Sequence, residues 1–231
     1  MISFLINQLF PEICPICKRQ SDSISTSPIC PDCWKGISLY KGTRCKVCGK
    51  PHVSSYAETC SNCIIVRPFY TQTLYYGLYE GVLKEALHLL KYNSIKRLAD
   101  SLSNLMTEIL ENVDAHILIS IPLHKKRLLQ REFNQSAVMG YKIAKRLSIE
   151  FDAYGIKRVV NNPPQSLKKV KDRIENVKNI FVVNIDVRDK KIILFDDIIT
   201  TGSTMNEAAR VLIKNGAKEV YAAAIARTYL E

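Results

Sequence analysis

The sequence predicts an α/β protein, in which a mostly parallel β-sheet carries helices on both faces and follows a small cysteine-rich module. Three observations support this prediction. From residue 71 onward, apolar runs of strand length alternate with segments of helical periodicity, a pattern typical of parallel sheets. All eight cysteines of the 231-residue chain lie before residue 64. A hydrophobic fraction of 47% permits one ordinary core and argues against a largely disordered chain.

The cysteines occur as four pairs, with two residues between the members of each pair. They are Cys14 with Cys17, Cys30 with Cys33, Cys45 with Cys48, and Cys60 with Cys63. Such a pair directs two thiolates at one tetrahedral metal ion, whereas disulfide frameworks belong to oxidising compartments. We therefore predict a double zinc ribbon with two structural zinc sites of four cysteine ligands each. The spacing leaves open whether adjacent or interleaved pairs share a site. A redox dithiol is the alternative for a single pair, and four copies argue against it.

The remaining elements follow in order along the chain. Residues 1–13 are expected to form an amphipathic lead-in and residues 64–68 a junction, so we place the domains at 1–68 and 69–231. Apolar residues at helical spacing predict two helices within residues 83–109, a third at residues 135–147 and a fourth from Met205 to Ile213. Strands are expected at residues 73–79, 116–121, 180–183, 191–195 and 219–225.

The charge balance narrows the class of partner. The chain has 33 Lys and Arg residues against 22 Asp and Glu residues, a formal net charge of +11. This excess favours an anionic partner such as a polyphosphate or a nucleic acid. No apolar run reaches the ~18 residues needed to cross a bilayer, and the first residues lack the basic start of a secretory signal. We expect a cytoplasmic protein without a transmembrane segment.

The most informative stretch is residues 192–204, an apolar strand that carries Asp196 and Asp197 to its carboxyl end. Open α/β sheets bind ligands at that end. Five small residues then lead into a helix: Thr200, Thr201, Gly202, Ser203 and Thr204. Their backbone N–H groups and hydroxyls suit a phosphate monoester, whereas the two acids suit sugar hydroxyls. Together these groups specify a ligand with a diol at one end and a phosphate at the other, such as a ribose 5-phosphate.

This stretch resembles the 5-phosphoribosyl-1-pyrophosphate (PRPP) signature of type I phosphoribosyltransferases. The resemblance implies a type I phosphoribosyltransferase fold for the second domain and PRPP binding by the seven acidic and loop residues just named. In the branch of that family that acts on 6-oxopurines, an Asp stands three positions after the second acid. This chain has Thr200 there, which argues against a 6-oxopurine substrate.

Further stretches resemble the ComF family, in which a cysteine-rich zinc domain precedes a phosphoribosyltransferase domain. They are residues 86–92, Pro122 with residues 131–135, and residues 163–165 with Leu167, Arg173 and Asn176. One departure is Glu132, where the family has Gly between the Arg and the Phe. The resemblance implies a role in natural transformation, in which imported single-stranded DNA is handled inside the cell and the competence machinery supplies partners.

Phosphoribosyl transfer would need cations around the leaving diphosphate, because its transition state is oxocarbenium-like. Magnesium bound with PRPP is expected from the resemblance. Lys126 and Arg131 follow the strand that ends at residue 121, and we predict that they line the pyrophosphate side. Gln165, Lys169 and Arg173 lie in a segment that resembles the loop closing over the site in this fold. The alternative for all five is an exposed connector with solvated charges.

Two functions from different classes therefore remain. The first is a PRPP-binding protein that handles single-stranded DNA through basic clusters at residues 125–127, 142–146 and 168–171. The second is a metabolic phosphoribosyltransferase that acts on a small amine or a nucleobase and has no DNA role. The sequence leaves the acceptor and catalytic activity open. Because the chain ends soon after the last strand, we expect the zinc module to cover the site.

Overall fold

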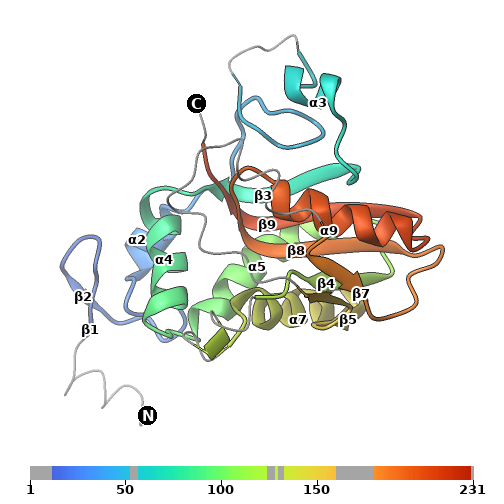
Figure 1. The fold of residues 1–231 in the computed structure, drawn as a ribbon. Helices are drawn as coiled ribbons and strands as arrows, with labels where there is room; N and C mark the ends of the chain where they lie inside the picture. Colours follow the sequence, from blue (N-terminus) through green and yellow to red (C-terminus); the bar gives the residue numbers. More distant parts are fainter. Residues whose placement is uncertain (1–11, 53–56, 124–127, 130–132, 160–178, 230–231) are drawn as a thin grey trace.

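A computed structural model of the chain describes residues 12–52, 57–123, 128–129, 133–159 and 179–229 (Figure 1). Its centre is a five-stranded sheet in the order β3-β9-β8-β4-β5, in which every neighbouring pair is parallel. The strands are β3 (Gln72–Leu78), β4 (Ile117–Ser120), β5 (Glu150–Asp152), β8 (Lys191–Ile199) and β9 (Glu219–Arg227). The predicted parallel sheet is confirmed, and the carboxyl ends of its strands meet at one edge.

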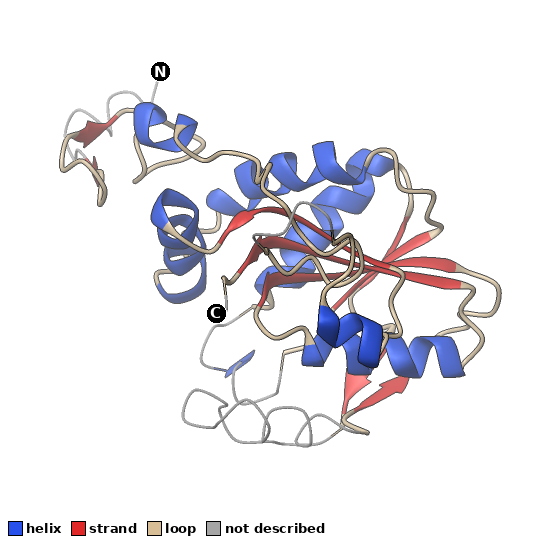
Figure 2. Cartoon of the chain, turned by 90° about the horizontal axis from the view of Figure 1, so that it is seen from above, coloured by secondary structure: helices blue, strands red, loops and turns tan. Residues whose placement is uncertain are grey.

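Helices cover both faces of this sheet, as Figure 2 shows from above. They are α4 (Gly81–Tyr92), α5 (Leu98–Leu110), α7 (Gln135–Leu147) and α9 (Ser203–Lys214). On one face, Leu102 of α5 and Ile143 of α7 share a core cluster with Ile193 of β8. On the opposite face, Leu212 of α9 shares a second cluster with Ile192. Because Ile192 and Ile193 are adjacent in the strand, their side chains point to opposite faces, and the strand is buried on both.

Two short strands lie outside the main sheet. β6 (Ile156–Arg158) and β7 (Phe181–Val183) pair antiparallel with each other, with Ile156 opposite Val183. The strand predicted at residues 180–183 is confirmed as β7, and the structure places it in this separate pair. Phe181 is buried, whereas Val182 is 42% exposed, so only one face of this strand is covered. A strand covered on one face suits an antiparallel pair better than the interior of a parallel sheet.

The first ribbon, which we define as residues 12–36, packs on the face that carries α4 and α5. It contains β1 (Glu12–Ile13), β2 (Gln20–Ser21) and α2 (Pro31–Lys35). Ile29 is fully buried in the core cluster of α4 and α5. The Ser101 hydroxyl of α5 donates a hydrogen bond to the Ser25 carbonyl at 3.2 Å. The first ribbon is thus joined to the sheet through these two helices.

The second ribbon, residues 44–66, packs on the face that carries α9. It contains α3 (Ser61–Ile65), and Val47 and Cys63 belong to the same core cluster as Met205 of α9. In Figure 1 the second ribbon lies above β3, on the side of the sheet away from the first ribbon. The two ribbons therefore flank the edge of the sheet that β3 forms.

The segment between the ribbons covers the open edge of β3. The backbone N–H of Tyr40 donates a hydrogen bond to the Tyr76 carbonyl at 2.8 Å. This contact satisfies a backbone group that an edge strand would otherwise expose to pairing with another chain. Among the described helices, none combines the length and the apolar character that a membrane span requires.

Gly140 of α7 packs closely against side chains of the sheet, and this contact provides a test of the fold. A Cβ at this position would lie 2.9 Å from Leu118 Cδ2 and 3.1 Å from Phe151 Cε2. An exposed helical Gly→Ala change usually stabilises a protein by about 1 kcal/mol. We expect Gly140→Ala to lower the free energy of unfolding by about 1–3 kcal/mol instead, because the core is overpacked.

Denaturant unfolding measures this difference, and Lys145→Ala is the matched control because Lys145 is exposed on the same helix. A stabilising effect of Gly140→Ala would show that α7 does not press on the sheet at this point.

Candidate ligand-binding and metal sites

Two adjacent carboxylates lie near the carboxyl end of the central strand β8. Asp197 Oδ1 forms an ion pair with Lys91 Nζ of α4 at 2.8 Å, and both side chains are about nine-tenths buried. Asp196 Oδ1 accepts hydrogen bonds from the Ser136 hydroxyl of α7 at 2.8 Å and from the Asp197 N–H at 2.9 Å. Within the described residues, these bonds use only the Oδ1 atoms. The Oδ2 atoms are therefore the acceptors left for a ligand.

The environment of Asp196 favours its protonated form. Burial raises the pKa of Asp196 to about 7, and the neighbouring negative charge of Asp197 acts in the same direction. The positive charge of Lys91 and the hydrogen bond from Ser136 oppose this rise. The ligand-free acid pair thus carries fewer than two full negative charges near neutral pH, and a cationic or hydroxyl-bearing ligand would favour its ionisation.

A tight turn connects this strand to α9. Gly202 precedes α9 with φ of 80°, a left-handed conformation that residues with a Cβ adopt at a cost, and its Cβ position lies 3.3 Å from the Tyr70 hydroxyl. The hydroxyls of Thr201 and Ser203 are 2.9 Å apart. The Ser203 N–H donates a long hydrogen bond to Thr201 Oγ1 at 3.4 Å. The N–H groups in the first turn of a helix have no carbonyl partner within the helix, so Thr204 and Met205 can offer theirs to an anion, which the helix dipole also favours.

Three further polar residues lie at this edge of the sheet. The Gln135 side chain, at the start of α7, is fully buried with both polar atoms unpartnered among the described residues. The Ser120 hydroxyl, in the last residue of β4, is also buried and has no hydrogen-bond partner among the described residues. Asn134 caps α7 and donates from Nδ2 to the Ile121 carbonyl at 3.0 Å. Buried polar groups without partners are costly, so such groups are candidates for ligand contact.

The structure brings together all seven residues that we predicted to bind PRPP: Asp196, Asp197, Thr200, Thr201, Gly202, Ser203 and Thr204. The five predicted catalytic residues lie outside the described residues: Lys126, Arg131, Gln165, Lys169 and Arg173. Sequence reasoning assigned no role to Lys91, Ser136, Ser120 or Gln135. Lys91 and Gln135 lie in stretches that resemble the ComF family, and that resemblance could have pointed to them as site residues. Ser136 and Ser120 gave no local signal.

One predicted basic cluster has an internal partner. Lys142 Nζ and Arg146 Nη2 of α7 both lie 2.9 Å from Asp100 Oδ1 of α5. These charges hold two helices together, so they are less available to a nucleic acid. The clusters at residues 125–127 and 168–171 lie outside the described residues.

The eight cysteines form two groups of four, and no disulfide joins any of them. The groups are Cys14, Cys17, Cys30 and Cys33, and Cys45, Cys48, Cys60 and Cys63. Adjacent pairs therefore share a site, and the interleaved alternative is excluded. Within each group the sulfur atoms lie within 4.8 Å of one another.

This donor set fits zinc. Tetrahedral Zn–S bonds of about 2.3 Å separate neighbouring sulfurs by about 3.8 Å. The distances between Cys17 and Cys30 sulfurs and between Cys48 and Cys60 sulfurs are 3.6 and 3.7 Å. Four thiolates leave no open coordination position, so the bound metal would serve to stabilise the fold.

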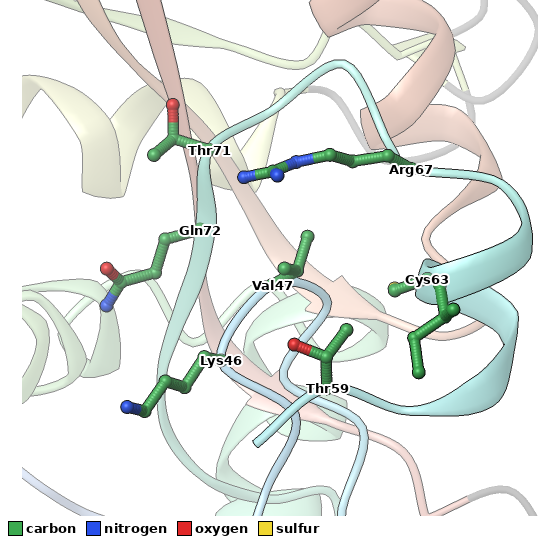
Figure 3. A pocket seen from close by; sticks show the side chains of 8 residues that line it. Lys46, Val47, Thr59, Cys63, Arg67, Thr71 and Gln72 are labelled. Carbon is green, nitrogen blue, oxygen red and sulfur yellow. The ribbon is translucent and has the colours of Figure 1, made fainter. Parts of the chain in front are cut away.

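A groove of about 510 Å³ separates the second ribbon from the start of β3 (Figure 3). Cys63 and Val47 line one side, and Arg67 extends across the groove toward Thr71. The groove therefore gives solvent a path toward one side of the second four-cysteine group.

Comparison with known proteins matches both parts of the chain. The double zinc ribbon domain family matches residues 5–64, and the phosphoribosyl transferase domain family matches residues 134–228. The DNA utilization protein YhgH of Escherichia coli strain K12 is 28% identical over 94% of this chain and 98% of its own length. Competence protein F of Haemophilus influenzae is 28% identical over 88% of this chain and 92% of its own length. Competence protein ComFC of Bacillus subtilis is 26% identical over 81% of this chain and 79% of its own length.

The fold and the site thus define a protein of type I phosphoribosyltransferase fold with an N-terminal double zinc ribbon. The relatives extend over both parts. The predicted resemblance to the ComF family is confirmed, and this chain is a homologue of those competence proteins.

The two metal sites differ in their connection to the core, which generates a prediction. Cys63 lies in the core cluster of α9, whereas Cys17 lies in neither core cluster. Protein purified without chelators should contain close to two zinc ions per chain. Cys63→Ser should lower the free energy of unfolding by about 3 kcal/mol or more, because a ligand is lost inside the core. Cys17→Ser should change the free energy of the main unfolding transition by no more than about 1 kcal/mol relative to the wild type. Equal losses would contradict this placement.

The raised pKa of Asp196 predicts a pH dependence of stability. An unfolded Asp titrates near pH 3.9, so the folded chain holds its proton to higher pH than the unfolded chain. This group therefore contributes stability that is fully present below about pH 4 and is lost as the pH rises through about 7. Asp196→Asn, which keeps the acceptor for Ser136, should raise the melting temperature at pH 8.5 by more than at pH 6.

Thermal unfolding at the two pH values measures the effect. Asp186→Asn, at an exposed acid, is the control. An Asp196→Asn shift that is equal at both pH values would show that Asp196 is already ionised in the folded chain at pH 6.

Proposed function

We propose that this protein binds PRPP at the carboxyl edge of its sheet and handles single-stranded DNA in natural transformation. The observation that carries the first part is the acid pair of β8 followed directly by the left-handed Gly202 turn and the start of α9. The second part is supported by relatives whose names describe competence and DNA utilization. The family match to a phosphoribosyl transferase domain supports PRPP as the ligand.

The geometry supports a ligand with two chemically different ends. The 5-phosphate would accept hydrogen bonds from the first N–H groups of α9 and from the Thr201 and Ser203 hydroxyls. The ribose hydroxyls would donate to the Oδ2 atoms of Asp196 and Asp197, which the described residues leave unused. Lys91 offsets one of the two acid charges, so the acid pair repels the nearby diphosphate less than two free carboxylates would.

Magnesium would neutralise the diphosphate and orient it, and carboxylate and phosphate oxygens are the ligands it prefers. The unused oxygens of the acid pair fit such a role. Of the chain's own residues, Gln135 and Ser120 are well placed to contact the ligand because their buried polar atoms lack partners. Transfer would further require the cations that we predict at Lys126, Arg131, Lys169 and Arg173, together with Gln165.

The alternative is a metabolic phosphoribosyltransferase that acts on a small amine or a nucleobase. One observation favours it: the basic cluster of α7 is engaged with Asp100. DNA binding then rests on the clusters at residues 125–127 and 168–171, in keeping with the overall charge of +11.

PRPP binding can be tested by calorimetry in the presence of magnesium. Asp196→Asn combined with Asp197→Asn should weaken binding about 100-fold, since two charged acceptors worth about 1.4 kcal/mol each are lost. Asp186→Asn, at an exposed acid, is the matched control and should bind as the wild type does. Unchanged affinity in the double variant would remove PRPP from this site.

DNA handling is tested by anisotropy of a labelled oligothymidylate over a range of salt concentrations. The affinity should fall steeply with salt if phosphates are contacted, and Lys142→Gln should change it little because Lys142 is paired with Asp100. PRPP binding without salt-sensitive DNA binding would favour the metabolic alternative. Pyrophosphate release that depends on an added acceptor would demonstrate transfer.

A further inference from the structure

The helix α4 reaches from the end of β3 to the end of β8, and one stripe of its side chains faces the carboxyl edge of the sheet. Lys84, His88 and Lys91 are spaced so that they lie on the same side of the helix. At one end of the stripe, Lys84 Nζ lies 6.0 Å from the centroid of the Tyr79 ring, directly after β3. At the other end, Lys91 pairs with Asp197 of β8. The surface between these contacts therefore borders the acid pair.

Two aromatic rings lie on this surface. The rings of His88 and Tyr92 are one helical turn apart, with centroids separated by 4.8 Å and planes inclined at 40°. His88 is exposed, and Tyr92 is 63% exposed although it directly follows the buried Lys91. Aromatic side chains gain most when they are buried in a core or an interface, so an exposed pair beside a ligand site is a candidate contact surface.

The loop after α4 fixes the position of this ring pair relative to the ligand site. Lys96 Nζ lies 5.1 Å from the centroid of the Phe133 ring. Phe133 directly precedes Asn134, the N-cap of α7, and the first turn of that helix contacts the acid pair. Tyr92 thus lies between Lys91, which is held at the acid pair, and Lys96, which is held beside the start of α7. The exposed ring of Tyr92 is therefore placed at the rim of the proposed ligand site.

The chemistry of this surface fits an unstacked nucleobase. A nucleobase presents a flat π face to an aromatic ring, and such stacking tolerates any base. Lys84 lies one turn before the ring pair and Lys96 four residues after it, and both are exposed. They supply the positive charge that neighbouring phosphates require. In a duplex the faces of each base are covered by the next base pairs, so a single strand is the form of DNA that offers them.

The openness of the surface favours a strand over a free nucleotide. Sites for small molecules usually enclose most of the ligand's surface. The Tyr92 side chain is instead 63% exposed, so a base stacked on it would keep its other face open to solvent. A strand compensates for such a shallow contact, because its adjacent phosphates bind at the same time as the base.

We propose that His88 and Tyr92 form a stacking surface for a base of single-stranded DNA at the rim of the site that contains the acid pair. Lys84 and Lys96 contact the flanking phosphates. This inference rests on the proposed DNA-handling function and adds to it the residues that contact a base. The stacked base then lies beside the proposed sugar-phosphate ligand.

The experiment measures the anisotropy of two labelled oligonucleotides of equal length, an oligothymidylate and its abasic analogue, with the zinc-loaded full chain. Both carry the same phosphates, so the ratio of their affinities reports base contact. The wild type should bind the oligothymidylate about 10-fold more tightly. Tyr92→Ala should reduce this preference to within about twofold and leave the affinity for the abasic analogue unchanged. Tyr92→Phe should keep the preference, because the ring stacks without its hydroxyl. Tyr154→Ala is the matched control, since Tyr154 is 81% exposed beyond β5, the edge strand farthest from β3.

The outcomes separate this inference from the proposed function. Equal binding of the two oligonucleotides by the wild type, or a preference that survives Tyr92→Ala, would overturn the stacking surface and leave DNA handling in place. Absence of binding to either oligonucleotide would overturn the proposed DNA function, and the stacking surface with it. Thymidine 5′-monophosphate at millimolar concentration should not displace the oligothymidylate. Displacement that Tyr92→Ala abolishes would assign the surface to a free nucleotide and overturn the choice of a strand.

Discussion

The burial of two adjacent carboxylates at the end of the central strand is the constraint on which the ligand site depends. The repulsion between Asp196 and Asp197 is reduced because Lys91 pairs with one and the Ser136 hydroxyl donates to the other. Lys91 lies in the last turn of α4 and Ser136 in the first turn of α7. The ionised acid pair therefore requires both helices to be docked on the sheet, because a buried charge without its partner is strongly destabilising.

The cysteine-rich segments are part of the core of this protein. The first ribbon buries Ile29 against α4 and α5, and the second buries Cys45, Val47 and Cys63 on the face that carries α9. The segment between them pairs with the edge strand through Tyr40. Short segments with little apolar surface hold their shape through metal ligation, and here that local order also completes both faces of a larger sheet.

The second ribbon also approaches the loop that we propose for phosphate binding. Tyr70, which follows the second ribbon, places its hydroxyl 3.3 Å from the Cβ position of Gly202, and it shares a core cluster with Cys63. The zinc module and the phosphoribosyltransferase part are thus packed against each other, as required if the module is to shield the site. Such packing offers a physical reason for the two parts to occur in one chain, since the metal-stabilised ribbon supports the wall of the proposed ligand site.

Local patterns determined much of this structure. The paired cysteines, the helix at residues 135–147 and the contiguous strand, acid pair and Gly202 turn were all predictable, because each depends on residues close together in the chain. The three-residue strands β5 and β6 were not, since they are too short for periodicity to show. Only the tertiary structure decided which cysteine pairs share a site, and only it joined Lys91 to Asp197 across 106 residues. The physical reason is that the burial of a side chain and the identity of its partner depend on how helices and strands pack. Packing brings together residues that are far apart in the chain, and the sequence around one of them does not indicate the other.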